Sequence, residues 1–439
     1  MSVLTDLRTL AVHRDFRKLF AVRLVSQAGD GFFQMGLTTL FFFSPEKAAD
    51  TGAIVVGFTV QLLPFTVLAP LVGPLLDRWR RRQVLLVGNL ARAALAVLLA
   101  VIMATQGVGW PVYVLALVAL GVNRFLLSAL SAGLPHVVPR PQLLMANTVT
   151  PTLGAVSWVL GLGGGLLLRL LLPEGVGRDV AAVALGAALF TTGGLLALRL
   201  GRGRLGPDHP AAGLAAAVRA SLAELADGAR WLVRRRTPAL ALGVMSAHRF
   251  VYGVNLMALI LIARNLLEDP ADADAGLATF ALLAGLSFAG NGLSIILTPL
   301  AHERVSPARW IVVCLGIGAV GQALLATSWS RPVVGAAAVL LGLSVQGAKI
   351  AVDTIVQRDT DDAYRGRAFS LYDMLYNAAL VGAAALAYLV LPDTGWSRPV
   401  SLVLTAALIA LAATYGRADA RADGRADARA QARPDVVGP

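Results

Sequence analysis

Long apolar stretches recur along almost the whole chain, and they restrict the possible fold more than any other feature. Each is roughly twenty residues long, enough for a helix to cross a hydrocarbon core of about 30 Å. Of the 439 residues, 57% are hydrophobic and 15% are charged, whereas soluble domains are about 25% charged. The pattern predicts an all-α membrane protein with twelve transmembrane helices, at residues 16–43, 53–76, 83–105, 112–134, 144–172, 179–200, 239–263, 276–301, 310–328, 333–355, 367–391 and 399–416.

Basic residues gather on one side of these predicted spans and account for the formal net charge of +12. Loops rich in Lys and Arg face the cytoplasm in membrane proteins. We therefore expect a multi-pass protein of the cell membrane with both termini in the cytoplasm. Because topology explains the charge, nucleic acid is not expected as a partner. Most Lys and Arg lie in the termini and in the loops at 77–82, 135–143, 199–238, 302–309 and 356–367.

The twelve spans divide six and six around a central polar segment. Two similar charged turns follow the second and eighth spans, "GPLLDRWRRRQVLLV" at 73–87 and "TPLAHERVSPARWIVV" at 298–313, and they indicate an internal repeat. Parallel repeats of six helices are typical of transporters, with the site near mid-membrane between them. We expect an N-terminal six-helix bundle at 1–198, a linker at 199–238, a C-terminal six-helix bundle at 239–416 and a basic tail at 417–439.

The linker and the tail each allow two interpretations. Apolar residues recur in the linker at helical spacing, which favours either an amphipathic helix on the inner membrane face or an ordinary solvated helix. In the tail, arginines recur every four residues and would form a basic stripe on a helix that could meet anionic lipid. Repetitive, polar, Ala-rich sequence more often stays disordered, so disorder is favoured there. The residues concerned are Leu214, Val218, Leu222, Leu225 and Leu232, and Arg417, Arg421, Arg425, Arg429 and Arg433.

The loop after the second span carries a recognisable signature. It resembles the Gly-x-Leu-x-Asp-Arg-x-Gly-Arg-Arg pattern of the major facilitator superfamily, with Arg80 in place of the second glycine. Other stretches resemble a branch of that superfamily rich in bacterial drug and siderophore exporters: "FRKLFAVRLVSQAGDGF", "VVPRPQLLMANTV", "LADGARWLVRRRTPAL" and "YRGRAFSLYDMLYN". The matching signature residues are Gly73, Leu75, Asp77, Arg78, Arg81 and Arg82.

This resemblance implies a secondary active transporter of a bacterial-type cell membrane, working by alternating access as two six-helix halves rock around a central cavity. The branch implies proton-coupled efflux, as an antiporter, of a small amphiphilic compound that is drug-, siderophore- or lipid-like. The expected partners are this substrate, the proton and membrane lipids, for a monomer without enzymatic activity, cofactor or metal. An uptake permease and a transport-inactive sensor or scaffold of the same fold remain alternatives.

The signature loop also has a physical interpretation as a gate. Asp77 can accept hydrogen bonds from backbone donors at a helix N-terminus, and the resemblance places the start of the eleventh helix, near Arg367, beside it. Positive-inside topology alone explains the arginines but not this acid.

In the fifth span, Gly161 and Gly165 are spaced for close helix packing.

Polar and charged residues inside the spans are the candidate site. A charge at mid-membrane costs about 2.5 to 3.5 kcal/mol on insertion scales, so it normally faces protein or water. The candidates fall on the first, fourth, seventh and tenth spans, which the resemblance places around the cavity. They are Arg23, Asp30, Asn123, Arg124, His248, Arg249, Gln346 and Lys349, while Arg92 of the third span either snorkels or pairs with an acid.

Asp30 is the one acid expected near mid-membrane. It is either the proton or ion-pair switch of transport, or half of a static ion pair, with Arg23, Arg124 or Arg249 as its partner. The excess of cations among the candidates favours an anionic or zwitterionic substrate. This inference is weakened because Lys349 and Asp353, four residues apart, can neutralise each other.

Overall fold

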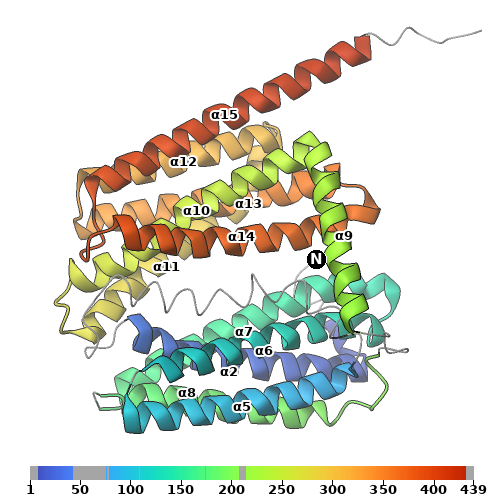
Figure 1. Ribbon diagram of the computed structural model, residues 1–439, viewed down its shortest axis with the longest axis vertical. Helices are drawn as coiled ribbons and strands as arrows, with labels where there is room; N and C mark the ends of the chain where they lie inside the picture. Colours follow the sequence, from blue (N-terminus) through green and yellow to red (C-terminus); the bar gives the residue numbers. More distant parts are fainter. Residues whose placement is uncertain are drawn as a thin grey trace, which may run out of the picture. The chain divides into compact units, whose positions relative to one another are not determined.

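The computed structural model describes residues 8–42, 76, 79–107, 109–173, 175–206 and 214–431, and this part of the chain is helical without any strand. Figure 1 shows long helices joined by short connections. They are α2 (Arg14–Phe42), α5 (Arg81–Gln106), α6 (Trp110–Gly133), η1 (Leu134–His136), η2 (Arg140–Gln142), α7 (Leu143–Leu171), α8 (Gly177–Ala197), α9 (Leu214–Arg234), α10 (Arg236–Asn265), α11 (Ala273–His302), α12 (Pro307–Thr327), α13 (Arg331–Asp359), α14 (Asp362–Val390) and α15 (Arg398–Gln431).

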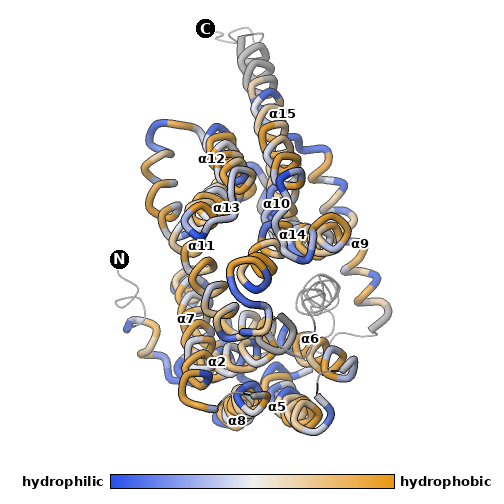
Figure 2. Tube along the Cα trace, turned by 90° about the vertical axis from the view of Figure 1, so that its left-hand side faces the viewer, coloured by the Kyte–Doolittle hydropathy of each residue, from blue (hydrophilic) through white to orange (hydrophobic). Residues whose placement is uncertain are grey.

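Ten of the described helices are long and apolar enough to cross a membrane. They are α5 to α8 and α10 to α15, and they coincide with ten of the twelve predicted spans. Helix α2 carries the first predicted span, and the second, at 53–76, lies almost wholly outside the described residues. The all-α membrane fold is therefore confirmed. Figure 2 shows hydrophobic residues along most of each spanning helix.

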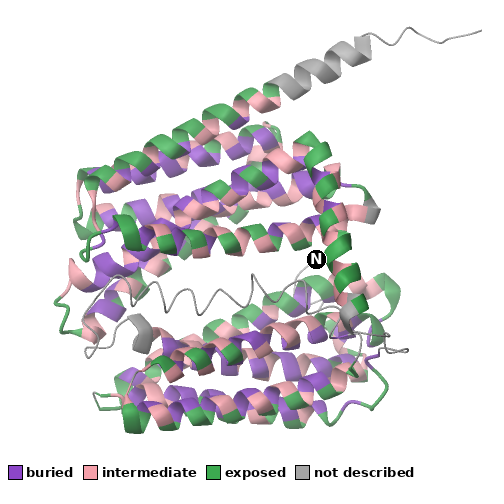
Figure 3. Cartoon of the chain, in the orientation of Figure 1, coloured by how far each residue is buried: buried purple, intermediate pink, exposed green. Residues whose placement is uncertain are grey.

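These helices carry exposed as well as buried residues along their length, as Figure 3 shows. Leu160 and Leu170 of α7 are 69% and 78% exposed, and Phe288 of α11 is 67% exposed. Water does not tolerate apolar surface of this extent, whereas hydrocarbon does. The exposed faces of the helices are thus suited to lipid.

The described residues divide into two compact units, one up to Ala223 and the other from Glu224 onward. In the first unit α2 packs on α7 and α8, and α5 packs on α6 and α8. The second unit repeats this order, with α10 on α14 and α15, and α12 on α13 and α15. When the helices of each unit are numbered as the six predicted spans of that half, the same pairs form in both units. The first span packs on the fifth and sixth, and the third packs on the fourth and sixth.

Glycines allow α2 and α7 to approach backbone to backbone. A Cβ at Gly161 would collide with the carbonyl oxygen of Ala28, and one at Gly31 would collide with that of Trp158. A Cβ at Gly165 would come within 2.7 Å of the Met35 side chain. The close packing expected from Gly161 and Gly165 is therefore present, and it positions α2 for the contacts of the site.

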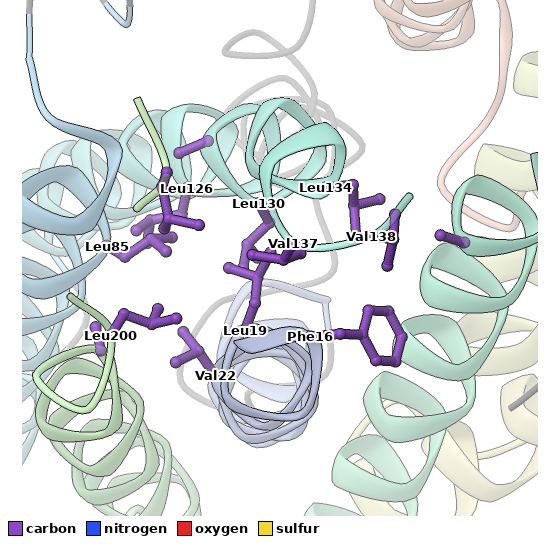
Figure 4. Packing of buried hydrophobic residues seen from close by; sticks show 14 of the residues in the cluster. Phe16, Leu19, Val22, Leu85, Leu126, Leu130, Leu134, Val137, Val138 and Leu200 are labelled. Carbon is purple, nitrogen blue, oxygen red and sulfur yellow. The ribbon is translucent and has the colours of Figure 1, made fainter. Parts of the chain in front are cut away.

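The first unit contains an apolar cluster, and Figure 4 shows how its side chains pack. Phe16, Leu19 and Val22 of α2 meet Leu126 and Leu130 of α6. All five side chains are at most 2% exposed, so this end of α2 is held by close-packed side chains. Arg23 and Asp30 lie further along the same helix.

Helix α9 packs its C-terminal half on the start of α14. Trp231 stacks on Tyr364 with 4.9 Å between ring centroids, and Asp227 accepts a 2.9 Å hydrogen bond from Arg367. Gly228 leaves room for the Arg367 stem, and Leu232 is 5% exposed. This half of the predicted linker is thus docked on protein rather than solvated on all sides.

The basic tail differs from the expected disorder over its first part. Helix α15 continues without a break through Arg417, Arg421, Arg425 and Arg429 to Gln431. Residues 432–439 lie outside the described part of the chain.

Candidate functional site

Asp30 of α2 and Arg92 of α5 form an ion pair inside the first unit. The side chains are 1% and 0% exposed, so the pair is sealed from solvent. The Arg92 guanidinium carbon lies 3.8 Å from the centre of the Phe190 ring of α8, and Asn123 of α6 lies beside the Asp30 carboxyl. Four helices therefore converge on one buried carboxylate.

The sequence builds this arrangement from small and polar residues at helical spacing. Gly29 admits the Phe190 ring, which would come within 2.8 Å of a Cβ at that position. One turn away from Asp30, Ser26 donates a 3.1 Å hydrogen bond to Asn89, which is itself one turn from Arg92. The two polar contacts thus join α2 to α5 at successive turns.

The expected partners of Asp30 were wrong. Arg23 lies seven residues from Asp30, about 10 Å along the helix axis, and its side chain extends to Gly154 of α7 instead. Arg249 instead contacts the rings of Tyr252 and Tyr376, and Arg124 is half-buried on α6 beside Asn123. Of the two alternatives for Arg92, pairing with an acid is correct and snorkelling is not.

Arg23 is a second buried cation of the first unit. It is 6% exposed, and its Nε and Nη1 atoms have no hydrogen-bond partner among the described residues. The nearby Ser157 of α7 donates to the Leu24 carbonyl at 2.7 Å. The Arg23 side chain therefore lies in the packed contact between α2 and α7.

His248 of α10 is buried in the core of the second unit rather than in an open cavity. Its Nε2 lies 3.0 Å from Ser344 Oγ, and this hydroxyl donates its proton to the Cys314 carbonyl at 2.6 Å. Because the hydroxyl has one proton, Nε2–H must be the donor to Ser344. His248 thus links α10, α12 and α13.

Arg249, the next residue, faces tyrosines. Its guanidinium carbon lies 4.8 Å from the Tyr252 ring and 4.1 Å from the Tyr376 ring of α14. Both distances are within the range of cation–π interaction. Arg249 is half-buried, and its Nε atom has no hydrogen-bond partner in the described structure.

Lys349 of α13 is engaged locally. It donates a 2.7 Å hydrogen bond to Asp353 one turn on, which is the neutralising pair that the spacing allowed. Its ammonium lies 5.7 Å from the centre of the Tyr372 ring, and Tyr372 meets Tyr376 edge-on at 5.8 Å. Gln346 is half-buried on the same helix.

The arginines of the signature loop bind carbonyl oxygens of their own unit. Arg81 donates to the carbonyls of Ala132 and Leu205 at 3.0 and 2.8 Å. Arg82 donates to Ala197 and Leu198, at the C-terminal end of α8, at 3.3 and 3.2 Å. The Ala132 and Leu198 carbonyls lie at the C-terminal ends of α6 and α8, where a helix leaves carbonyl oxygens without partners inside the helix. Gly73, Asp77 and Arg78 lie outside the described residues.

Sequence reasoning missed the groups that surround the expected charges, above all Phe190, Tyr252 and Tyr376. Arg92 carried a usable signal, since it shares a helical face with Asn89 in a span that is otherwise apolar. No feature of the sequence distinguished the aromatic residues, because tyrosine and phenylalanine are ordinary residues of membrane helices.

A pocket of the second unit lies away from all of these residues. It is formed between α10, α12 and α15, and none of the predicted site residues lines it. Its polar side chains include Asn255, Gln322 and Ser401. The candidate site is therefore defined by charge and contact rather than by this pocket.

Comparisons with known proteins agree with this architecture. Two curated relatives, uncharacterized MFS-type transporters of Mycobacterium tuberculosis and Mycobacterium bovis, are each 37% identical over 399 residues, which is 90% of this chain and 88% of theirs.

Among solved structures, a mutant of the nucleoside transporter NupG aligns with a TM-score of 0.66 at 12% identity, over 91% of this chain and 98% of its own. An auto-inhibited POT family peptide transporter gives 0.65 at 12% identity, over 96% and 98%. A bacterial homologue of the iron transporter ferroportin gives 0.65 at 16% identity, over 92% and 98%. The family model of the Major Facilitator Superfamily matches residues 28–384. The chain therefore belongs to the major facilitator superfamily of membrane transporters.

Proposed function

We propose that this transporter couples proton movement to the efflux of a small amphiphilic compound, and that Asp30 carries the coupled proton. The observation behind the proposal is the sealed ion pair of Asp30 with Arg92. Among the described residues of the first unit, no other acid sits so deeply inside a spanning helix.

Protonation of Asp30 changes the balance of forces between helices. Removing one partner of a buried ion pair typically costs about 3 to 5 kcal/mol, because the other charge is left without compensation. The Phe190 ring offsets part of this for Arg92, by about 2 kcal/mol for a buried contact. Loss of the carboxylate charge therefore loosens α2 from α5, which gives the proton a means to drive rearrangement. A static pair would serve only to hold the two helices together.

The direction of transport and the placement in a bacterial-type cell membrane rest on the sequence resemblance to the exporter branch. The placement of both termini in the cytoplasm rests on the excess of Lys and Arg on one side of the spans. Solved structures of similar fold include transporters named for nucleosides, peptides and iron. An uptake permease is therefore the alternative, and a flux measurement decides between the two.

The test is accumulation of fluorescent anionic, zwitterionic and cationic amphiphiles in cells that lack the gene. Wild-type protein should lower the accumulation of at least one class, and a protonophore should abolish the effect. Asp30→Asn should behave like wild type treated with protonophore. Ser26→Ala, which removes the neighbouring buried contact of α2 with α5 but no charge, should still export. Higher accumulation on expression would indicate uptake, and no change with any class would contradict transport.

A further inference from the structure

We infer that Arg249, framed by Tyr252 and Tyr376, binds the acidic group of an organic monoanion with an aromatic body. This inference rests on the proposed function, because it names the class of the transported amphiphile. The site lies wholly within the second unit, between α10 and α14.

Arg249 has no acidic partner in the described part of the chain. None of the described carboxylates forms an ion pair with it, and its Nε atom is buried without a hydrogen bond. Other cations of the second unit differ in this respect: Lys349 is paired with Asp353 at 2.7 Å, and Arg331 with Glu268 at 2.6 Å. The charge of Arg249 is therefore available to a ligand.

The two tyrosine rings hold the guanidinium without neutralising it. A cation–π contact attracts the charge to a ring face but leaves the N–H edges of the guanidinium free to donate. Those edges match a carboxylate or sulfonate, which accepts two parallel hydrogen bonds. The arrangement thus orients Arg249 for an oxyanion, and burial in a helix of a membrane protein adds to its need for one.

The surroundings limit the ligand to one negative charge and favour an aromatic body. Lys349 is paired with Asp353, so Arg249 remains as the cation of this cluster without an ion-pair partner among the described residues. Tyr372, 3% exposed, extends the row of rings by its edge-on contact with Tyr376. His248 is directed into the helix core toward Ser344 and adds no charge on this side.

A purely structural role is the competing explanation, in which Arg249 only ties α10 to α14. The structural role and the binding role make different predictions for ligand binding. The purified full-length protein in lipid nanodiscs is tested by equilibrium binding with 2-naphthalenesulfonate, the neutral 2-naphthalenesulfonamide and the cationic 2-naphthylmethylammonium. We expect the sulfonate to bind about tenfold more tightly than either of the others, since only it pairs with Arg249.

The variants separate the two roles. Arg249→Gln should weaken sulfonate binding by about tenfold or more and leave the sulfonamide unchanged, because only the charged pair is lost. Arg249→Lys should keep part of the affinity, and Tyr376→Phe should keep most of it. The matched control is Arg398→Gln: its guanidinium carbon lies 5.8 Å from the Trp396 ring, but its Nε is satisfied by the Ala326 carbonyl.

Three results would overturn the inference: wild type that prefers the cation or binds no sulfonate, Arg249→Gln that binds the sulfonate as tightly as wild type, or Arg398→Gln that weakens it equally. Thermal unfolding of each variant identifies misfolding. If Arg249→Gln misfolds, Arg249→Lys takes its place in the comparison with wild type. Asp30→Asn should bind the sulfonate like wild type. Loss of coupling in Asp30→Asn with unchanged binding in Arg249→Gln would reject this site alone and leave the proposed function standing.

Discussion

Arg92 of α5 pairs with Asp30 of α2 where neither side chain is more than 1% exposed. The two residues lie 62 positions apart in the sequence, and the contact fixes the register of their helices. It also places the acid beside a cation and an aromatic ring rather than in hydrocarbon. The stability and the proposed coupling of the first unit both depend on this contact.

A double-mutant cycle on this pair should show strong coupling. Asp30→Asn and Arg92→Gln should each lower the free energy of unfolding by about 3 to 5 kcal/mol, since each leaves one charge uncompensated. The double variant should lose much less than the sum. Thermal or denaturant unfolding in detergent measures this. Additive losses would show that the two charges do not interact.

Close packing of α2 on α7 should depend on one glycine and not on its neighbour. Gly161→Ala places a Cβ against the Ala28 carbonyl and should cost about 1 to 3 kcal/mol through overpacking. Gly163→Ala is the matched control, because a Cβ there meets nothing within 4 Å. It should be neutral or slightly stabilising. Unfolding measurements on both variants check the prediction, and equal effects would contradict it.

Arg82 should hold the start of α5 to the end of α8. Arg82→Gln removes the donors to the Ala197 and Leu198 carbonyls and should cost about 1 to 3 kcal/mol. Amide exchange should become faster near residues 195–206. The matched control is Arg80→Gln, since Arg80 carries the same charge two residues earlier and its side chain is exposed. If both variants exchange alike, the arginines act through charge alone.

The docking of α9 on α14 should depend on Trp231 more than on its charges. Trp231→Ala removes the ring stacked on Tyr364 and should expose residues 214–235 to limited proteolysis. Trp231→Phe should protect them in part. Asp227→Asn should have a small effect, about 0 to 1 kcal/mol, because its pair with Arg367 is half exposed. Cleavage of Trp231→Ala at the wild-type rate would show that the stack does not hold the helix.

The sequence was sufficient for the helices and for some contacts, for a physical reason in each case. Span length follows from hydrocarbon thickness, so the ten described spans agree with the prediction. The close packing at Gly161 and Gly165 could be predicted because small residues four apart lie on one helix face. The pair of Lys349 with Asp353 could be predicted because both residues belong to one turn of one helix.

Contacts between distant helices could not be predicted in the same way. The partner of Asp30 depends on the lateral register of α2 and α5, and no local spacing sets that register. The same holds for Arg82, whose carbonyl acceptors lie more than a hundred residues further along the chain. The linker pattern indicated an apolar face on α9 but not that α14 would cover part of it.

A count of protons exchanged on ligand binding tests Asp30 most directly. Purified protein in weakly buffered detergent is mixed with saturating 2-naphthalenesulfonate while a pH indicator is followed. Wild type should release the protons carried by the protonated fraction of Asp30, up to about one per protein, as expected when substrate and proton compete. Asp30→Asn should bind the probe and release none. Equal proton release from wild type and Asp30→Asn would contradict Asp30 as the carrier of the coupled proton.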